Sequence, residues 1–150
     1  MSDLSGQIND NLSALRDRVE QACERSGRSP STVQLVAVTK YARAEWVKEL
    51  VSLGQTLLGE SRPQQLVERA TTLSQEICWH LIGHLQRTKV RLVLPHARLI
   101  HSVDSRRLAE RISHTAGELA LRSKVLLEIN ISGEVSKDGF PVDQLREDWP

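Results

Sequence analysis

The chain is poor in aromatic residues, cysteines and long apolar runs. Aromatic residues make up 3% of its 150 residues, which leaves few stacking platforms for single-stranded nucleic acid. No apolar run approaches the ~20 residues that a membrane-spanning helix needs. The two cysteines, Cys23 and Cys78, stand far apart and form neither a metal-binding nor a redox spacing. Reduced thiols and a cytoplasmic location are the simplest interpretation.

An excess of charge of either sign is also missing. The formal net charge is +1 and the isoelectric point is about 7.9, so nothing suggests that the chain binds nucleic acid or an anionic membrane. The N-terminus lacks the basic segment and apolar core of a signal peptide. No Gly-x-Gly-x-x-Gly or P-loop follows an apolar run, which removes the strongest argument for a nucleotide-binding open sheet.

What the sequence does contain is an alternation of strand-like and helical patterns. Apolar residues spaced by three and four predict a helix over residues 3–26. Apolar runs then predict strands, and the amphipathic stretches between them predict helices. The expected strands are residues 34–39, 56–59, 78–82, 99–103 and 125–131. The expected helices are residues 44–53, 63–75, 85–93 and 105–121, with a further helix starting in "PVDQLREDW".

This alternation predicts parallel strands joined by right-handed crossovers, an α/β fold. Nearly continuous apolar strands predict a sheet that is covered on both faces. Pro63 suits the first position of a helix, and Asp104-Ser105 can cap the next one. An open doubly wound sheet and a (β/α) barrel both fit. We expect one domain over residues 1–150, with an N-terminal helix in 1–30 and βα units in 31–150.

Polar residues stand where the predicted strands end, and parallel α/β folds gather their chemistry there. The residues concerned are Thr39-Lys40, Gly59-Glu60-Ser61, His80 with His84, Asp104, and Glu128 with Asn130. Alternation places Lys40 and Asn130 on faces that would meet in the mouth of a barrel. A lysine there is partly withdrawn from water, which favours the neutral amine that attacks an aldehyde to form an imine. The alternative is that Lys40 reaches into solvent just beyond its strand.

Several of these polar residues allow a structural interpretation as well. His80 lies either beside a ligand ring or in the core with a backbone partner. A zinc site of Cys78, His80 and His84 lacks a fourth ligand. Glu60 and Asp104 suit a cap or an ion pair better than acid–base chemistry.

Two residues near the C-terminal end leave comparable alternatives open. A buried Asn130 must be hydrogen-bonded, to a cofactor or to a neighbouring strand end. Ser136–Gly139 reads first as a turn, and its Lys137 is a second candidate amine.

Five motifs occur in one order: "VAVTK", a Gly-Glu dipeptide, "WHLIGHLQRTK", "IHSVDS" and "INISGEVSKDG". On these motifs, residues 35–139 resemble the pyridoxal-phosphate homeostasis protein family, small relatives of the barrel of alanine racemase. The resemblance implies a (β/α) TIM-type barrel, fold type III, that binds pyridoxal 5′-phosphate (PLP). It implies that Lys40 forms the Schiff base, and that Ser61, His80 and Asn130 are weaker candidates to line the pocket.

The resemblance further implies a role in intracellular vitamin B6 homeostasis. Family members hold PLP without catalytic turnover, so no catalytic residue is expected. Apo PLP enzymes are the expected recipients, with neither nucleic acid nor membrane as partner. The full-length proteins are monomers, whereas this shorter chain leaves self-association open.

The sequence departs from the family pattern in two ways. Gly59-Glu60-Ser61-Arg62 stands where the family has Gly-Glu-Asn-Tyr, and Ser61 lacks the second donor of an amide. Five strands are found where a closed barrel has eight, so roughly 50–100 residues of a typical barrel are absent. In the family, the phosphate-binding loops and an arginine facing the pyridine nitrogen lie in that C-terminal part. We therefore expect either weak PLP binding by this chain alone or closure of its sheet by a partner.

Two rival functions remain. An alanine-racemase-like enzyme would need a second acid–base group opposite the lysine, usually supplied by an added β-domain that is not evident here. A ligand-free barrel fragment would recruit a partner through its two unpaired sheet edges.

Overall fold

The computed structural model describes residues 4–148. Helix α1 (Leu4–Ser26) and the short turn η1 (Pro30–Thr32) precede the sheet. The sheet strands are β1 (Ala37–Val38), β2 (Leu57–Glu60), β3 (Cys78–Leu81), β4 (Ala97–Val103) and β5 (Val125–Leu127). The connecting helices are α2 (Ala44–Ser52), α3 (Pro63–Thr72), η2 (Arg87–Lys89) with α4 (Val90–Val93), and α5 (Arg106–Glu118). Strands β6 (Ile129–Asn130) and β7 (Phe140–Pro141) and helix α6 (Val142–Asp148) follow.

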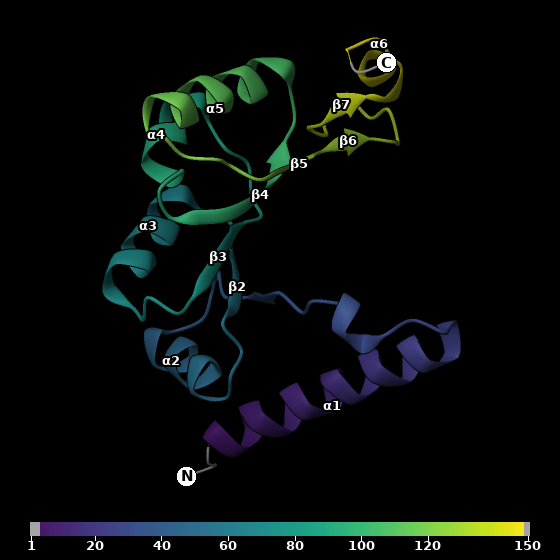
Figure 1. Ribbon diagram of the computed structural model, residues 1–150, viewed down its shortest axis with the longest axis vertical. Helices are drawn as coiled ribbons and strands as arrows, with labels where there is room; N and C mark the ends of the chain where they lie inside the picture. The colour runs from purple at the N-terminus through teal and green to yellow at the C-terminus, as the bar shows by residue number, and fades with distance from the viewer. Residues whose placement is uncertain (1–3, 149–150) are drawn as a thin grey trace.

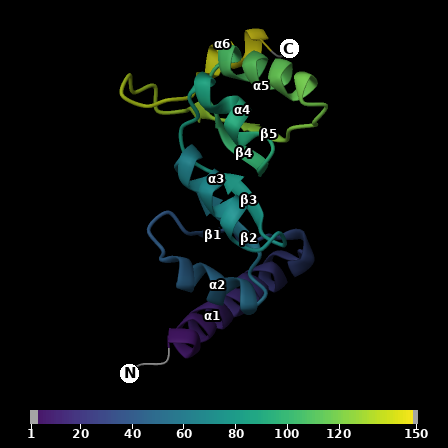
Figure 2. The ribbon, with the colours of Figure 1, turned by 90° about the vertical axis from the view of Figure 1, so that its left-hand side faces the viewer.

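The five strands form one parallel sheet in the order β1-β2-β3-β4-β5. The predicted α/β alternation is confirmed, and the sheet has the strand order of part of a barrel without being closed. Helices α2 to α5 lie on one side of the sheet, while α1 and the β6–β7–α6 segment lie at opposite ends of the molecule (Figure 1). Seen from that side, α3 and α4 stand in front of the strands (Figure 2). None of the helices in residues 4–148 is both long and apolar enough to cross a membrane.

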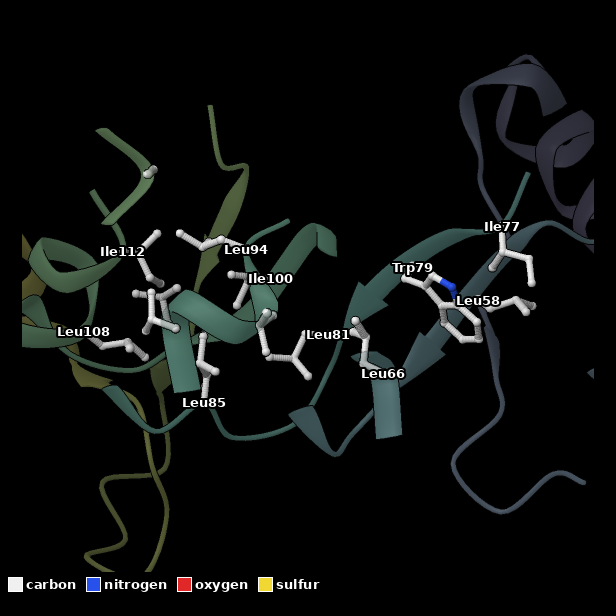
Figure 3. Close-up of a cluster of buried hydrophobic side chains, with 14 of the residues drawn as sticks. Leu58, Leu66, Ile77, Trp79, Leu81, Leu85, Leu94, Ile100, Leu108 and Ile112 are labelled. Atoms are coloured by element: carbon white, nitrogen blue, oxygen red, sulfur yellow. The ribbon is translucent and has the colours of Figure 1, made fainter. Parts of the chain in front are cut away.

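The hydrophobic core lies between the sheet and helices α2 to α5 (Figure 3). Alternate strand residues point into it, and helix residues meet them from the other side. The fully buried members include Leu58, Leu66, Leu81, Ile100 and Leu108. Each such side chain contributes about 1.5–3 kcal/mol when it leaves water, so this layer holds the strands in register.

The opposite face of the sheet is open at its edge strands β1 and β5 within residues 4–148, so the prediction that both faces are covered is wrong there. Ala37 and Leu127 pack against the core. Their neighbours Val38 and Leu126 therefore point the other way, and they are 54% and 48% exposed. A run of apolar residues was compatible with both arrangements, because it does not say whether a second layer is present.

Two predicted strands differ from the observed ones. The first is shorter, with only Ala37 and Val38 paired to β2. The last divides at Glu128, whose N–H donates to the Val103 carbonyl while its carbonyl accepts from the Phe140 N–H. The chain thus passes at this residue from the large sheet to the small β6–β7 sheet, which no motif predicted.

The predicted start of α3 is confirmed, whereas the predicted capping hydrogen bond of α5 is not observed. Pro63 is the first residue of α3, as expected. Ser105 occupies the N-cap of α5, but its hydroxyl donates to Asp104 Oδ1 at 2.9 Å and makes no capping hydrogen bond.

Candidate functional site

The loop that follows β1 carries Lys40, and a single side chain of α3 holds this loop in place. The guanidinium of Arg69 donates to the Thr39 carbonyl at 2.8 Å and to the Ala42 carbonyl at 2.6 Å. Lys40 and Tyr41 lie between these two carbonyls. Both ends of the segment that presents the amine are therefore fixed to one rigid group.

A buried carboxylate completes this arrangement. Glu60, at the end of β2, has no exposed surface. It pairs with Arg69 and accepts a hydrogen bond from the Thr39 hydroxyl at 2.6 Å. Its second oxygen, Oε2, has no partner among the described residues. The ion-pair interpretation of Glu60 is confirmed, and such a buried pair is stable only while both partners are present.

The amine itself is more accessible than predicted. Lys40 is exposed, and its Nζ lies 5.1 Å from the centroid of the Tyr41 ring, within the range of a cation–π contact. The expectation that Lys40 is partly withdrawn from water is wrong for this structure. The reason is the open sheet face, since nothing in residues 4–148 covers the carboxyl end of β1.

The sheet face beside this loop forms an apolar floor. The register aligns Val38, Gly59 and His80 in one row across β1, β2 and β3. A Cβ on Gly59 would lie 3.2 Å from Val36 Cγ1 and 3.4 Å from Ile82 Cγ2, so these two side chains meet over the glycine. Strands are about 4.8 Å apart, which places the backbone of His80 about 10 Å across the sheet from β1.

His80 has a partner that the sequence interpretation missed. Its Nδ1 lies 2.9 Å from Nε2 of His101, on the neighbouring strand β4. Burial lowers the pKa of both rings, and His101 and Arg98 lower the pKa of His80 further. Both imidazoles are then neutral near pH 7. One shared N–H joins the rings, so one outer nitrogen is a donor and the other an acceptor. The available signal was the histidine of "IHSVDS", close to a predicted strand end.

Ser61 follows Glu60 and lies against the exit of β3. A Cβ on Gly83 would come within 2.2 Å of the Ser61 carbonyl oxygen, so only glycine fits there. The Ser61 hydroxyl, partly buried, has no hydrogen-bond partner in residues 4–148. It remains available to a ligand.

The side chain of Asn130 forms hydrogen bonds within its own loop. Its Nδ2 donates to the carbonyls of Glu134 and Lys137 at 2.9 and 3.3 Å, and its Oδ1 accepts from the Gly133 N–H at 3.0 Å. It belongs to the small β6–β7 sheet and not to the large sheet, whose last strand was predicted to include it. Lys137 Nζ pairs with Glu134 at 2.6 Å.

The described potential metal ligands gather in a different set from the one weighed on sequence. The set is His84, Asp104 and Asp138, whose ligand atoms lie within 4.8 Å of one another, and it includes neither Cys78 nor His80. His84 Nδ1 is 3.2 Å from Asp104 Oδ2 and 3.7 Å from Asp138 Oδ2. These are imidazole–carboxylate contacts, and the cap or ion-pair role expected for Asp104 stays a prediction.

Comparison with curated proteins gives a consistent set of relatives. No profile of a known protein family matches the chain. Proteins named pyridoxal phosphate homeostasis protein are 34% identical in Aquifex aeolicus and 36% identical in Escherichia coli K12, each over 91% of this chain. The human protein of that name is 38% identical over 87% of the chain. The chain spans 60% of the two bacterial relatives and 51% of the human one.

Solved structures agree with this result. PipY of Synechococcus elongatus, solved with PLP bound, matches with a TM-score of 0.73 and 34% identity, over 87% of this chain and 61% of PipY. A protein from Bifidobacterium adolescentis described as unknown matches with a TM-score of 0.86 and 34% identity, over 97% of this chain and 64% of that one. The resemblance predicted from the five motifs is confirmed.

Proposed function

We propose, from this chain's confirmed resemblance to the pyridoxal phosphate homeostasis proteins, that it binds PLP and serves vitamin B6 homeostasis. The observation that carries the proposal is the position of Lys40. Lys40 follows the first strand of a parallel sheet, in a loop segment whose flanking Thr39 and Ala42 carbonyls are held by Arg69. PipY, which resembles the chain, is solved with PLP bound.

The residues at this edge fit the aldehyde and the ring of PLP. Lys40 offers an accessible primary amine, and Val36 with Ile82 offers an apolar surface for one face of a planar ring. When bound, PLP supplies an aldehyde that condenses reversibly with a primary amine and releases water. Lys40 is the proposed attachment point, where the Schiff base predicted from the family would form.

The other side chains of the site would orient the ring of PLP and position the Lys40 loop. The neutral His80–His101 pair presents one donor and one acceptor, which suits the polar substituents of a pyridine ring. The Ser61 hydroxyl is a further donor. Arg69 and Glu60 fix the Lys40 loop from below the sheet, so we assign them a positioning role.

The holding of PLP without turnover, and its delivery to apo enzymes, are also part of the proposal.

Trapping with borohydride tests the attachment. We expect reduction of a PLP mixture to label Lys40, and the label to disappear in Lys40→Ala. Lys48→Ala, which changes an exposed lysine of α2, is the matched control and keeps the label. Lys137→Ala tests whether Lys137, the second candidate amine, also takes up label. Label spread over surface lysines, with none at Lys40 in the peptide map, would contradict the proposal.

A racemase activity is the second candidate, and the His80–His101 pair is the observation that favours it. A neutral imidazole can accept a proton, so the pair meets the need for an acid–base group besides the lysine. Racemisation of alanine by the purified chain, abolished in both Lys40→Ala and His80→Gln, would support this activity over that of a carrier.

A further inference from the structure

A hollow lies at the amino ends of the sheet strands, opposite the carboxyl ends where Lys40 is found. It has a volume of about 580 Å³ and is bounded by the start of β3, the start of β4 and residues 121–124 before β5. This size is within the usual range for small-molecule pockets. We call it the basal hollow, and no part of the proposed PLP site belongs to it.

Three cations line the basal hollow. They are Arg98, Arg122 and Lys124, all exposed. Their side chains form no hydrogen bond or ion pair with other residues in the described part of the chain. Glu76 is the one carboxylate among the lining residues. The hollow therefore carries an uncompensated positive charge.

Two of the lining residues, Trp79 and Ser123, each carry a buried donor without a partner among the described residues. Trp79 is 3% exposed, and its Nε1 has no partner among the described residues. Figure 3 shows this nitrogen on the edge of the indole that faces Ile77, itself a lining residue. The Ser123 hydroxyl is likewise buried and unpaired. Burying such groups costs free energy unless a partner accepts their hydrogen bonds.

The unpaired groups have one property in common: each donates hydrogen bonds. Indole, guanidinium and ammonium groups only donate. The complementary ligand is therefore rich in acceptors and negatively charged. We propose that the basal hollow binds a phosphate-bearing small molecule, with the phosphate between the arginines and Lys124. The apolar lining residues Ile77, Leu94 and Leu121 are available for the remainder of the ligand.

Nuclear magnetic resonance of the full chain tests the proposal, with inorganic phosphate and glycerol 3-phosphate as probes and no PLP present. The Trp79 indole N–H signal, assigned with Trp79→Phe, is expected to move saturably with either probe. Arg122→Gln/Lys124→Gln should weaken binding at least about tenfold, because two charge-assisted hydrogen bonds are lost. The matched control Arg16→Gln/Arg18→Gln removes the same charge from α1 and should leave the affinity within about twofold.

Three outcomes would overturn the proposal. The first is a Trp79 signal that does not move. The second is equal weakening in both double variants, which indicates general charge attraction. The third is equal affinity for citrate, which would remove the assignment to phosphate. Unchanged backbone signals elsewhere in each variant verify that it is folded, and Lys124→Gln alone serves if the double variant is not.

Discussion

At the scale of single residues, Arg69 connects three parts of the molecule. It holds two carbonyls of the Lys40 loop and pairs with a carboxylate that has no exposed surface. We expect Arg69→Gln to lower the free energy of unfolding by about 3–5 kcal/mol, because it leaves the buried Glu60 without its counter-charge. Urea denaturation measures this directly.

A surface ion pair provides the comparison for Arg69. Arg91 pairs with Glu118 while both side chains are well exposed, and Arg91→Gln should cost about 1 kcal/mol or less. Equal losses in the two variants would show that the Arg69 contacts contribute no more than an ordinary surface pair.

The His80–His101 pair predicts how stability depends on pH. The pKa of both rings is lowered by burial in the folded state. Above the unfolded pKa of about 6.5 both states are neutral, and stability is complete. As the pH falls below that value the unfolded chain takes up protons that the folded chain does not, so stability decreases.

We expect the free energy of unfolding to be lower at pH 5.5 than at pH 7.5, with part of this difference missing in His101→Gln. His114→Gln, on the exposed face of α5, is the control and should retain the full difference. A pH dependence that is unchanged in His101→Gln would show that the pair does not carry it.

At the scale of elements, the junction between the ends of β2 and β3 depends on one glycine. A methyl group on Gly83 would lie 2.2 Å from a backbone oxygen of Ser61, so Gly83→Ala must displace backbone. We expect a loss of about 3 kcal/mol in unfolding experiments. Gly117→Ala is the matched control, because its methyl group meets open space within α5. It should stabilise by about 0.5–1 kcal/mol, and a similar loss in both variants would contradict the argument from contact.

The predictions made from the sequence were both most and least successful for the secondary-structure elements. Apolar periodicity located the five sheet strands and their helices, because a segment that is buried on one side shows this in the spacing of its own apolar residues. The β6–β7 pair was missed because each strand has only two residues, too few for an apolar alternation to be recognised. Arg69 was missed because its partners Thr39 and Ala42 lie far from it in the sequence, and an arginine within a helical pattern looks like a solvent-facing residue. His101 stood in a recognised motif, but its pairing with His80 requires the strand register.

At the scale of the whole molecule, the open face and the two sheet edges that are unpaired within residues 4–148 favour self-association. Sedimentation should show an apparent mass that rises with concentration. Val38→Lys/Leu126→Lys places charges on the open face and should keep the chain monomeric. Leu15→Lys, which changes an exposed leucine of α1, should not. A chain that stays monomeric at all concentrations would contradict this prediction.

The strand order has a consequence for synthesis. Each strand of the large sheet pairs with the strand that precedes it in the sequence. The partner of each new strand has therefore already been synthesised. Assembly can then advance one βα unit at a time, with short loops to close at each step. The growing edge is always the newest strand, and the sheet is ready to accept another unit at every stage of translation.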